Sequence, residues 1–289
     1  MNIQTILAGA KYTSSRNDPD YAAYYARVLA NSSDLSTAEK TAAETLIIGL
    51  KAASHWSTLT SLFLFIGDDA NAAKTYVVGG NDCSSSGTVD LFDGTGNRYR
   101  RSTGFYRDGA SQYESRINFG AGSSFNWAGS NPLTSYFWGR NSQVGARQGM
   151  HPNTGGGDQW SVPSYHEASF SGGWQLKARR ADTGTQETGF GGTGIDTVSV
   201  GACAFDGTTG FAGRGLNSSD SGSGGTMTLS SAIDNVTSNF YLNADNPILG
   251  GAVFDGTEHS NAEMDAINIL FKDFVEDCGL TMTAVDPDV

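Results

Sequence analysis

The sequence predicts a mainly β protein, an antiparallel sandwich or jelly roll that follows an N-terminal helical hairpin and ends in a C-terminal helix. Glycine predicts the β region, because 32 of the 38 glycines lie between Tyr76 and Gly250, where they separate short apolar runs. Helical periodicity is confined to the two ends of the chain. We therefore expect an N-terminal arm and helical hairpin over residues 1–70, a sandwich with its closing helix over 71–280 and an acidic tail over 281–289.

The C-terminal helix has the clearest start and stop signals. Ser260 and Glu263 stand at capping-box spacing, so that each side chain can satisfy a free backbone amide at the helix start. Gly279 stands where a left-handed C-cap belongs. The apolar residues between them stand three or four apart and form one face: Met264, Ile267, Phe271, Phe274 and Cys278.

The N-terminal hairpin is predicted by two further cap signals. Asp18 and Pro19 are suited to the cap and first position of one helix, and Ser36 with Glu39 forms a capping box for the next. The first helix has an apolar face of Tyr21, Tyr24, Tyr25, Val28 and Leu29. The second has Ala43, Leu46, Ile47, Leu50 and Ala53, and Leu59, Leu62, Leu64 and Ile66 then lead into the β region.

Short strands are expected through the middle of the chain, at residues 88–92, 112–119, 135–138, 174–178, 197–205, 226–229, 239–242 and 251–254. Asp-Gly pairs at 93–94, 108–109, 206–207 and 255–256 predict turns. Segments 153–158 and 215–225 are rich in serine and glycine and predict surface loops, and the glycine-rich string Gly189 to Gly194 predicts a turn and not a phosphate loop.

Charge and cysteine content exclude several classes of protein. The net charge is −12, and residues 251–289 hold nine acidic residues against one lysine, which disfavours binding to nucleic acid. Three widely spaced cysteines form no CxxC or Cys/His motif, so we expect no disulfide framework and a reducing cytoplasm during folding. We expect no signal peptide and no membrane insertion, because the longest apolar run, Leu62 to Ile66, is far shorter than a membrane span.

Two stretches resemble known families. The first, "DPDYAAYYARVLANSSDLSTAEKTAAETLIIGLKAASHWSTLTSLFLF" (Asp18 to Phe65), resembles the helical lead-in of structural proteins of tailed bacteriophages, in which a "YxARV…LxxxxKxAxxxLIxGLKAAGxW" stretch precedes a glycine-rich sandwich. The second, "FYLNADNPILGGAVFDGTEHSNAEMDAINILFKDF" (Phe240 to Phe274), is similar to the closing strands and helix of concanavalin A-like, LamG-type sandwiches.

These resemblances imply a concanavalin A-like antiparallel β-sandwich displayed on a virion, as a capsid decoration or tail protein. They imply that its partners are other virion proteins, copies of itself and, on the outer surface, a host glycan. They also imply assembly in the host cytoplasm and a non-enzymatic, structural role.

Catalytic motifs are weak in this sequence. Concanavalin-like glycanases carry an E-x-D-x-E string on one strand, and the nearest string here, Glu263 and Asp265 followed by Asn268, falls at the start of a helix. There the acidic residues are expected to serve capping and the helix dipole. The histidines at positions 55, 151, 166 and 259 form no zinc motif. We expect His55 to pack against its neighbours and His259 to be exposed. His166 and Glu167 could together act as a general base, but no sequence motif indicates a partner nucleophile.

Aromatic residues give the best indication of a binding function. The candidate glycan-binding residues fall in or beside segments rich in glycine, serine and asparagine: Trp127, Trp138, Trp160, Tyr165 and Trp174. Strand alternation places Phe137 on one face and Tyr136 and Trp138 on the other, so these three cannot all be buried in one core.

Calcium is the one cofactor considered, since Asn243, Asp245 and Asn246, or Asp220, could supply oxygen ligands, although such residues are also ordinary in turns. The arginines at positions 98, 100, 101 and 107 are expected to form a solvated strand edge or to contact an acidic neighbour.

Three hypotheses follow from the sequence. The first is a non-enzymatic structural protein of a phage particle, without a cofactor. The alternative is a carbohydrate-binding module or lectin. A glycan hydrolase on the same fold is the third, and it needs a carboxylate pair that the sequence does not display.

Overall fold

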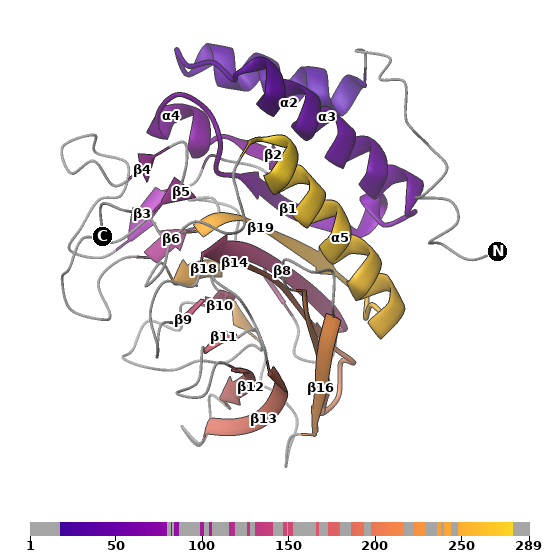
Figure 1. Cartoon of the computed structure of the whole chain (residues 1–289). Coiled ribbons are helices and arrows are strands. Elements are labelled where there is room, and N and C mark those ends of the chain that lie inside the picture. The colour runs from indigo at the N-terminus through magenta and orange to yellow at the C-terminus, as the bar shows by residue number, and fades with distance from the viewer. Residues whose placement is uncertain are drawn as a thin grey trace.

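A computed structural model of the chain shows a mainly β protein with helices at both ends (Figure 1). It describes residues 18–79, 82, 84–86, 99–100, 104–105, 116–118, 126–127, 131–140, 147–148, 150–152, 166–167, 173–179, 186–193, 198–216, 222–228, 236–237, 240–243 and 248–279. The helices are α2 (Pro19–Ala30), α3 (Thr37–Ala52), α4 (Ala70–Ala73) and α5 (Asn261–Asp277), with a 3-10 turn, η1 (Trp56–Thr58).

The strands alternate with short connections, as the glycine distribution predicts. They are β1 (Leu59–Leu64), β2 (Tyr76–Val78), β3 (Ser84–Ser86), β4 (Tyr99–Arg100), β5 (Gly104–Phe105), β6 (Arg116–Asn118), β7 (Asn126–Trp127), β8 (Leu133–Arg140), β9 (Arg147–Gln148), β10 (Met150–Pro152), β11 (His166–Glu167), β12 (Gly173–Arg179), β13 (Gln186–Thr193), β14 (Val198–Phe205), β15 (Gly210–Leu216), β16 (Gly222–Thr228), β17 (Val236–Thr237), β18 (Phe240–Asn243) and β19 (Ile248–Asp255).

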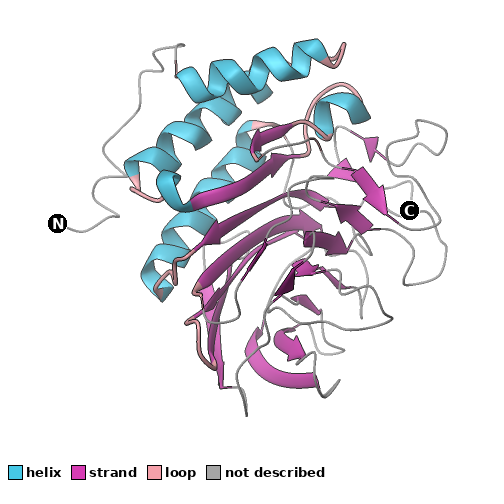
Figure 2. Ribbon diagram, turned by 180° about the vertical axis from the view of Figure 1, so that it is seen from behind, coloured by secondary structure: helices cyan, strands magenta, loops and turns pink. Residues whose placement is uncertain are grey.

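Among the described residues the largest sheet has the strand order β16-β15-β14-β8-β19-β1-β2, with β5 also paired to β19 and β4 to β5. All of these pairs are antiparallel. A four-stranded sheet, β10-β18-β6-β3, lies on the side of this main sheet away from the helices (Figures 1 and 2). The predicted fold class, an antiparallel β-sandwich with an N-terminal helical hairpin and a C-terminal helix, is therefore confirmed.

The main sheet is buried on both faces. One row of cross-strand neighbours, Leu62, Ala252, Tyr136 and Ala202, belongs to the apolar core that it shares with α5. The opposite face carries small residues such as Ser135, Cys203 and Val253, each no more than 2 % exposed. Because both faces exclude water, consecutive residues of the central strands are nearly all buried. Buried and exposed side chains therefore do not alternate along these strands.

α5 lies between the main sheet and α3. Its predicted apolar face is confirmed, with Met264, Ile267, Phe271 and Phe274 buried and Cys278 half-buried at the C-cap. On its other side Leu270 lies against Gly49 of α3, where an added Cβ would come within 2.9 Å of the leucine side chain. The absence of a side chain at Gly49 thus lets the two helices approach closely.

All of the predicted helix caps are present. The Asp18 carboxylate accepts hydrogen bonds from the backbone amides of Asp20 and Tyr21, at 3.0 and 3.2 Å. The two capping boxes, at Ser36 and at Ser260, are both complete. Gly279 has φ +77°, the left-handed conformation expected of a C-cap glycine.

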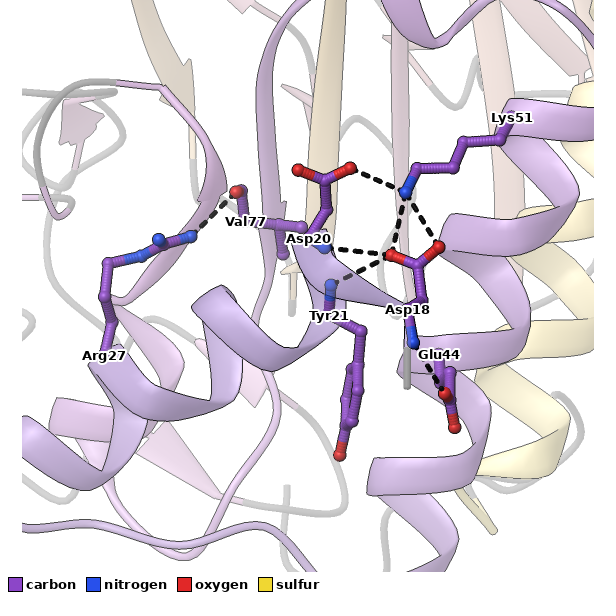
Figure 3. A network of polar contacts seen from close by, with 7 residues as sticks. All are labelled: Asp18, Asp20, Tyr21, Arg27, Glu44, Lys51 and Val77. Carbon is purple, nitrogen blue, oxygen red and sulfur yellow. Dashed lines mark hydrogen bonds and ion pairs between the residues drawn. The ribbon is translucent and has the colours of Figure 1, made fainter. Parts of the chain in front are cut away.

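Figure 3 shows how polar residues at both ends of α2 contact α3 and strand β2. Lys51 of α3 contacts both carboxylates at the start of α2, at 2.8 Å from Asp18 and 2.6 Å from Asp20. At the other end of α2, the Arg27 guanidinium donates to the carbonyls of Tyr76 and Val77. These contacts tie α2 to α3 and to the edge strand β2.

The N-terminal segment is part of the main core. β1 pairs with β19 and β2, and residues 24–66 share one hydrophobic cluster with β8, β14 and α5. The helical hairpin and β1 therefore contribute to the same core as the main sheet.

Several details of the sequence prediction were wrong. Leu29, expected on the buried face of α2, is 50 % exposed. Residues 189–193, expected in a turn, belong to β13, and the expected loop at 215–225 contains the end of β15 and the start of β16. Glycine-rich strands were missed because they lack the β-branched residues that identify a strand. The expected strand at 88–92, the turns at 93–94 and 108–109 and the loop at 153–158 lie outside the described residues.

We predict that Gly250→Ala destabilises the protein by about 1–3 kcal/mol or more, because core overpacking has that cost. An added Cβ would overlap with the Trp138 indole and lie 2.6 Å from the Phe63 carbonyl oxygen. Urea denaturation measures the change. Gly256→Ala is the matched control, since its φ of +70° costs about 1 kcal/mol but no atom lies within 4 Å. Equal losses in the two variants would contradict the proposed clash.

Candidate functional site

A cluster of polar and aromatic side chains lies where α5 begins, at one end of the main sheet. His259 is 2 % exposed, and a 2.7 Å hydrogen bond joins its Nδ1 to the Tyr136 hydroxyl. The His259 backbone amide donates to Thr134 Oγ1, which in turn donates to the Thr257 carbonyl. The segment that leads into α5 is thereby held against β8.

His55 joins this cluster from the connection after α3. Its ring centroid lies 4.2 Å from that of His259, and its Nε2 lies 3.7 Å from a carboxylate oxygen of Glu263. The ring also makes an edge contact with Phe254. His55 packs, as predicted, whereas the prediction that His259 is exposed is wrong. The sequence placed His259 before a helix cap without indicating that this segment crosses the end of a sheet.

The surroundings keep both imidazoles neutral. The pKa of His259 falls to about 3, because burial and, to a smaller extent, the neighbouring His55 lower it more than Glu263 raises it. No described side chain or backbone group accepts a hydrogen bond from His259 Nε2, so a proton there would be buried without a partner. Burial also lowers the pKa of His55.

The other titratable groups of the cluster also have shifted pKa values. Burial raises the pKa of the Tyr136 hydroxyl well above its usual value, with smaller contributions from Glu263 and Asp265. Burial raises the pKa of Glu263, but hydrogen bonds from Ser260 outweigh this and the net direction is downward.

The carboxylates that resemble a glycanase string are each engaged in a structural contact. Glu263 completes the capping box with Ser260. Asp265 forms a two-point ion pair with Arg214 of β15, at 2.8 and 2.5 Å. Asn268 donates to the Arg214 backbone carbonyl at 3.3 Å. The structural interpretation of this string is confirmed, and Arg214 is the partner that the sequence did not indicate.

The five candidate glycan-binding residues are not brought together in the described part of the chain. The prediction that Trp138 contacts a glycan is wrong, because its indole is fully buried and stacks on Phe271, with ring centroids 4.0 Å apart. Alternation in β8 places Tyr136 in the same core, as one of the two expected arrangements requires. Trp127 lies in β7 and Trp174 in β12, while Trp160 and Tyr165 lie outside the described residues.

The remaining candidates are only partly described. Asn243 ends β18, whereas Asp220, Asp245 and Asn246 lie outside the described residues. Where side chains are described, no group of three histidines, cysteines or carboxylates has a geometry that would hold a metal ion. His166 and Glu167 form β11, and Arg100 ends β4 beside Tyr99.

No described helix has the length and apolar character to cross a membrane.

The chain matches no protein-family model, and no curated protein matches its sequence. Several solved structures have a slight likeness. The CBM40 domain of the Ruminococcus gnavus IT-sialidase bound to α2,3-sialyllactose is 12% identical, with a TM-score of 0.36 over 52% of this chain and 95% of that one. The receptor-binding domain of botulinum neurotoxin type G is 9% identical, with a TM-score of 0.39 over 74% and 51%. An alginate lyase from Alteromonas sp. 272 is 10% identical, with a TM-score of 0.34 over 69% and 88%.

We predict that stability decreases as the pH falls from about 6.5 toward 3, because unfolded His259 binds a proton in this range and the folded form does not. Between pH 7 and pH 5 this group contributes a loss of at most about 2 kcal/mol. Urea denaturation at both pH values, with the wild type and His259→Gln, measures it.

The His259→Gln protein should lose most of this pH dependence. His55→Gln should lose less, because that side chain is more exposed and the nearby Glu263 carboxylate favours its charged form. A pH dependence unchanged in both variants would contradict the neutral, buried imidazole pair.

Proposed function

We propose that the chain is a non-catalytic carbohydrate-binding protein. Its glycan-contacting aromatic side chains would come from the strands and connections outside the main sheet. Trp127, Trp160, Tyr165 and Trp174 remain the candidates after the removal of Trp138.

This proposal rests on where the tryptophans lie: some belong to the core and the helical side, and others to small sheets outside the main sheet. Trp138 fills the core between the main sheet and α5, and Trp56 begins the 3-10 turn after α3, with its ring 5.1 Å from the Lys51 ammonium. Trp127 and Trp174 belong instead to two-stranded sheets outside the main sheet, β7 with β17 and β12 with β13. The segments around them are rich in glycine, serine and asparagine, whose small polar groups can hydrogen-bond sugar hydroxyls beside an aromatic ring.

The solved structures named above include a domain bound to a sialylated sugar. Their likeness to this chain is too slight to carry an argument about its ligand, so the proposal depends on the tryptophans alone. Glu263 and Asp265 of α5 support a non-catalytic role, because capping engages the first carboxylate and an ion pair engages the second.

Single alanine substitutions at Trp127, Trp160 and Trp174 should test the proposal. At least one of them should weaken glycan binding by about tenfold or more, as loss of a tryptophan anchor does in other interfaces. Binding is measured on a glycan array and then by calorimetry with the best ligand.

Trp56→Ala is the matched control, since it removes an indole from the helical side of the molecule. It should leave glycan binding unchanged. Absence of any glycan ligand for the wild type, or equal losses in Trp56→Ala and the three test variants, would overturn the proposal.

A second candidate function is a structural role in a phage particle, and the lead-in sequence favours it. The stretch from Asp18 to Phe65 that resembles phage structural proteins folds as α2, α3 and β1. The two functions are compatible, because a particle surface protein can also bind a glycan.

If this second candidate is right, the chain should be found in purified particles from a producing lysate. Mass spectrometry of those particles detects it, and electron microscopy shows whether it lies on the capsid or on the tail. Its presence in the lysate but absence from particles would remove the structural role and leave glycan binding untouched.

A further inference from the structure

The outer face of α2 is apolar, which is unusual for a surface helix. The polar residues Asp20 and Arg27 turn toward Lys51 and the carbonyls of β2, although the Asp20 side chain remains 47 % exposed. Every exposed position of this helix is apolar: Pro19, Ala22, Ala23, Ala26, Leu29 and Ala30. A solvated helix is expected to have the opposite arrangement, with its charges outward.

α5 provides an internal comparison. Its exposed positions include Asp273, Glu276 and Asp277, so that charge covers its solvent side. Leu29 of α2 is 50 % exposed and is the one exposed large hydrophobic residue among those described. An apolar face that continues along a whole helix is typical of a surface that another segment covers.

We propose that residues 1–17, which lead directly into α2, dock on this face through Ile3, Ile6, Leu7 and Ala10. These residues have the spacing i, i+3, i+4 and i+7, which forms one apolar stripe when helical. The small alanines of α2 would let such a segment approach closely.

The length of the intervening chain permits this docking. Residues 11–17 are seven residues, which span up to about 24 Å when extended. The 12 residues of α2 extend over about 18 Å. If residues 11–17 turn back before Asp18, the apolar stripe can therefore reach any turn of the helix.

The size of the face favours this occupant over a second copy of the chain. A helix about 18 Å long and about 10 Å wide offers roughly 180 Å² in projection, whereas a stable interface buries about 800 Å² on each partner. A segment joined to the helix does not lose the translational freedom that a separate partner loses, so a smaller contact suffices.

The test places a photoactive amino acid, p-benzoylphenylalanine, at Leu29 of the full chain. After irradiation, peptide mapping should find cross-links to residues 3–10 within single chains. The matched control carries the same group at Ala262, an exposed alanine of α5, and should give no cross-link to residues 3–10.

Two further variants test the apolar stripe in the Leu29-substituted protein. Ile6→Asp should lower the cross-link yield roughly tenfold, since it removes the burial of one large aliphatic side chain. Thr5→Asp adds the same charge off the stripe and should leave the yield unchanged. Cross-links between two chains would overturn the proposal in favour of a second copy. Cross-links to other elements alone, none at all, or equal yields in the two variants would also overturn it.

Discussion

Trp138 lies flat on Phe271 of α5, and the arrangement of the helical layer depends on this contact. The indole can lie there because its cross-strand neighbour in β19 is Gly250, whose missing side chain leaves the space that the ring occupies. Stacked aromatic pairs contribute about 0.5–1.5 kcal/mol beyond the burial of their area. Phe274 adds an edge contact to the same indole, so two turns of α5 are fixed on one tryptophan.

Polar contacts then determine the direction of α5. The Arg214–Asp265 ion pair fixes the helix over β15, and the hydrogen bond between His259 and Tyr136 fixes the segment before it over β8. Each of these side chains is of a type that catalysis also uses. Their burial and their partners show that here they orient one helix, which is the commoner use of such residues in a core.

The helices α2, α3 and α5 could be predicted from sequence, whereas the contacts between distant segments could not. Cap residues such as Asp18 and Ser260 act on amides two or three residues away, so local sequence is sufficient to predict them. The burial of His259 depends on Thr134 and Tyr136, more than 120 residues earlier. Strand β13 was missed because its glycines give no periodic signal, and Trp138 was misassigned because its glycine-rich neighbourhood on the sequence is not its neighbourhood in space.

The lead-in that resembles phage proteins is itself explained by packing in this fold. Within its "YxARV" string, Tyr24 and Val28 are fully buried, and Arg27 binds the carbonyls of β2. In "LIIGLKA", the glycine, Gly49, admits Leu270 of α5, and the lysine, Lys51, closes the polar network at the start of α2. Each of these residues thus helps to build the helical layer that covers the main sheet. Side chains occupied in this way are not free to contact a partner.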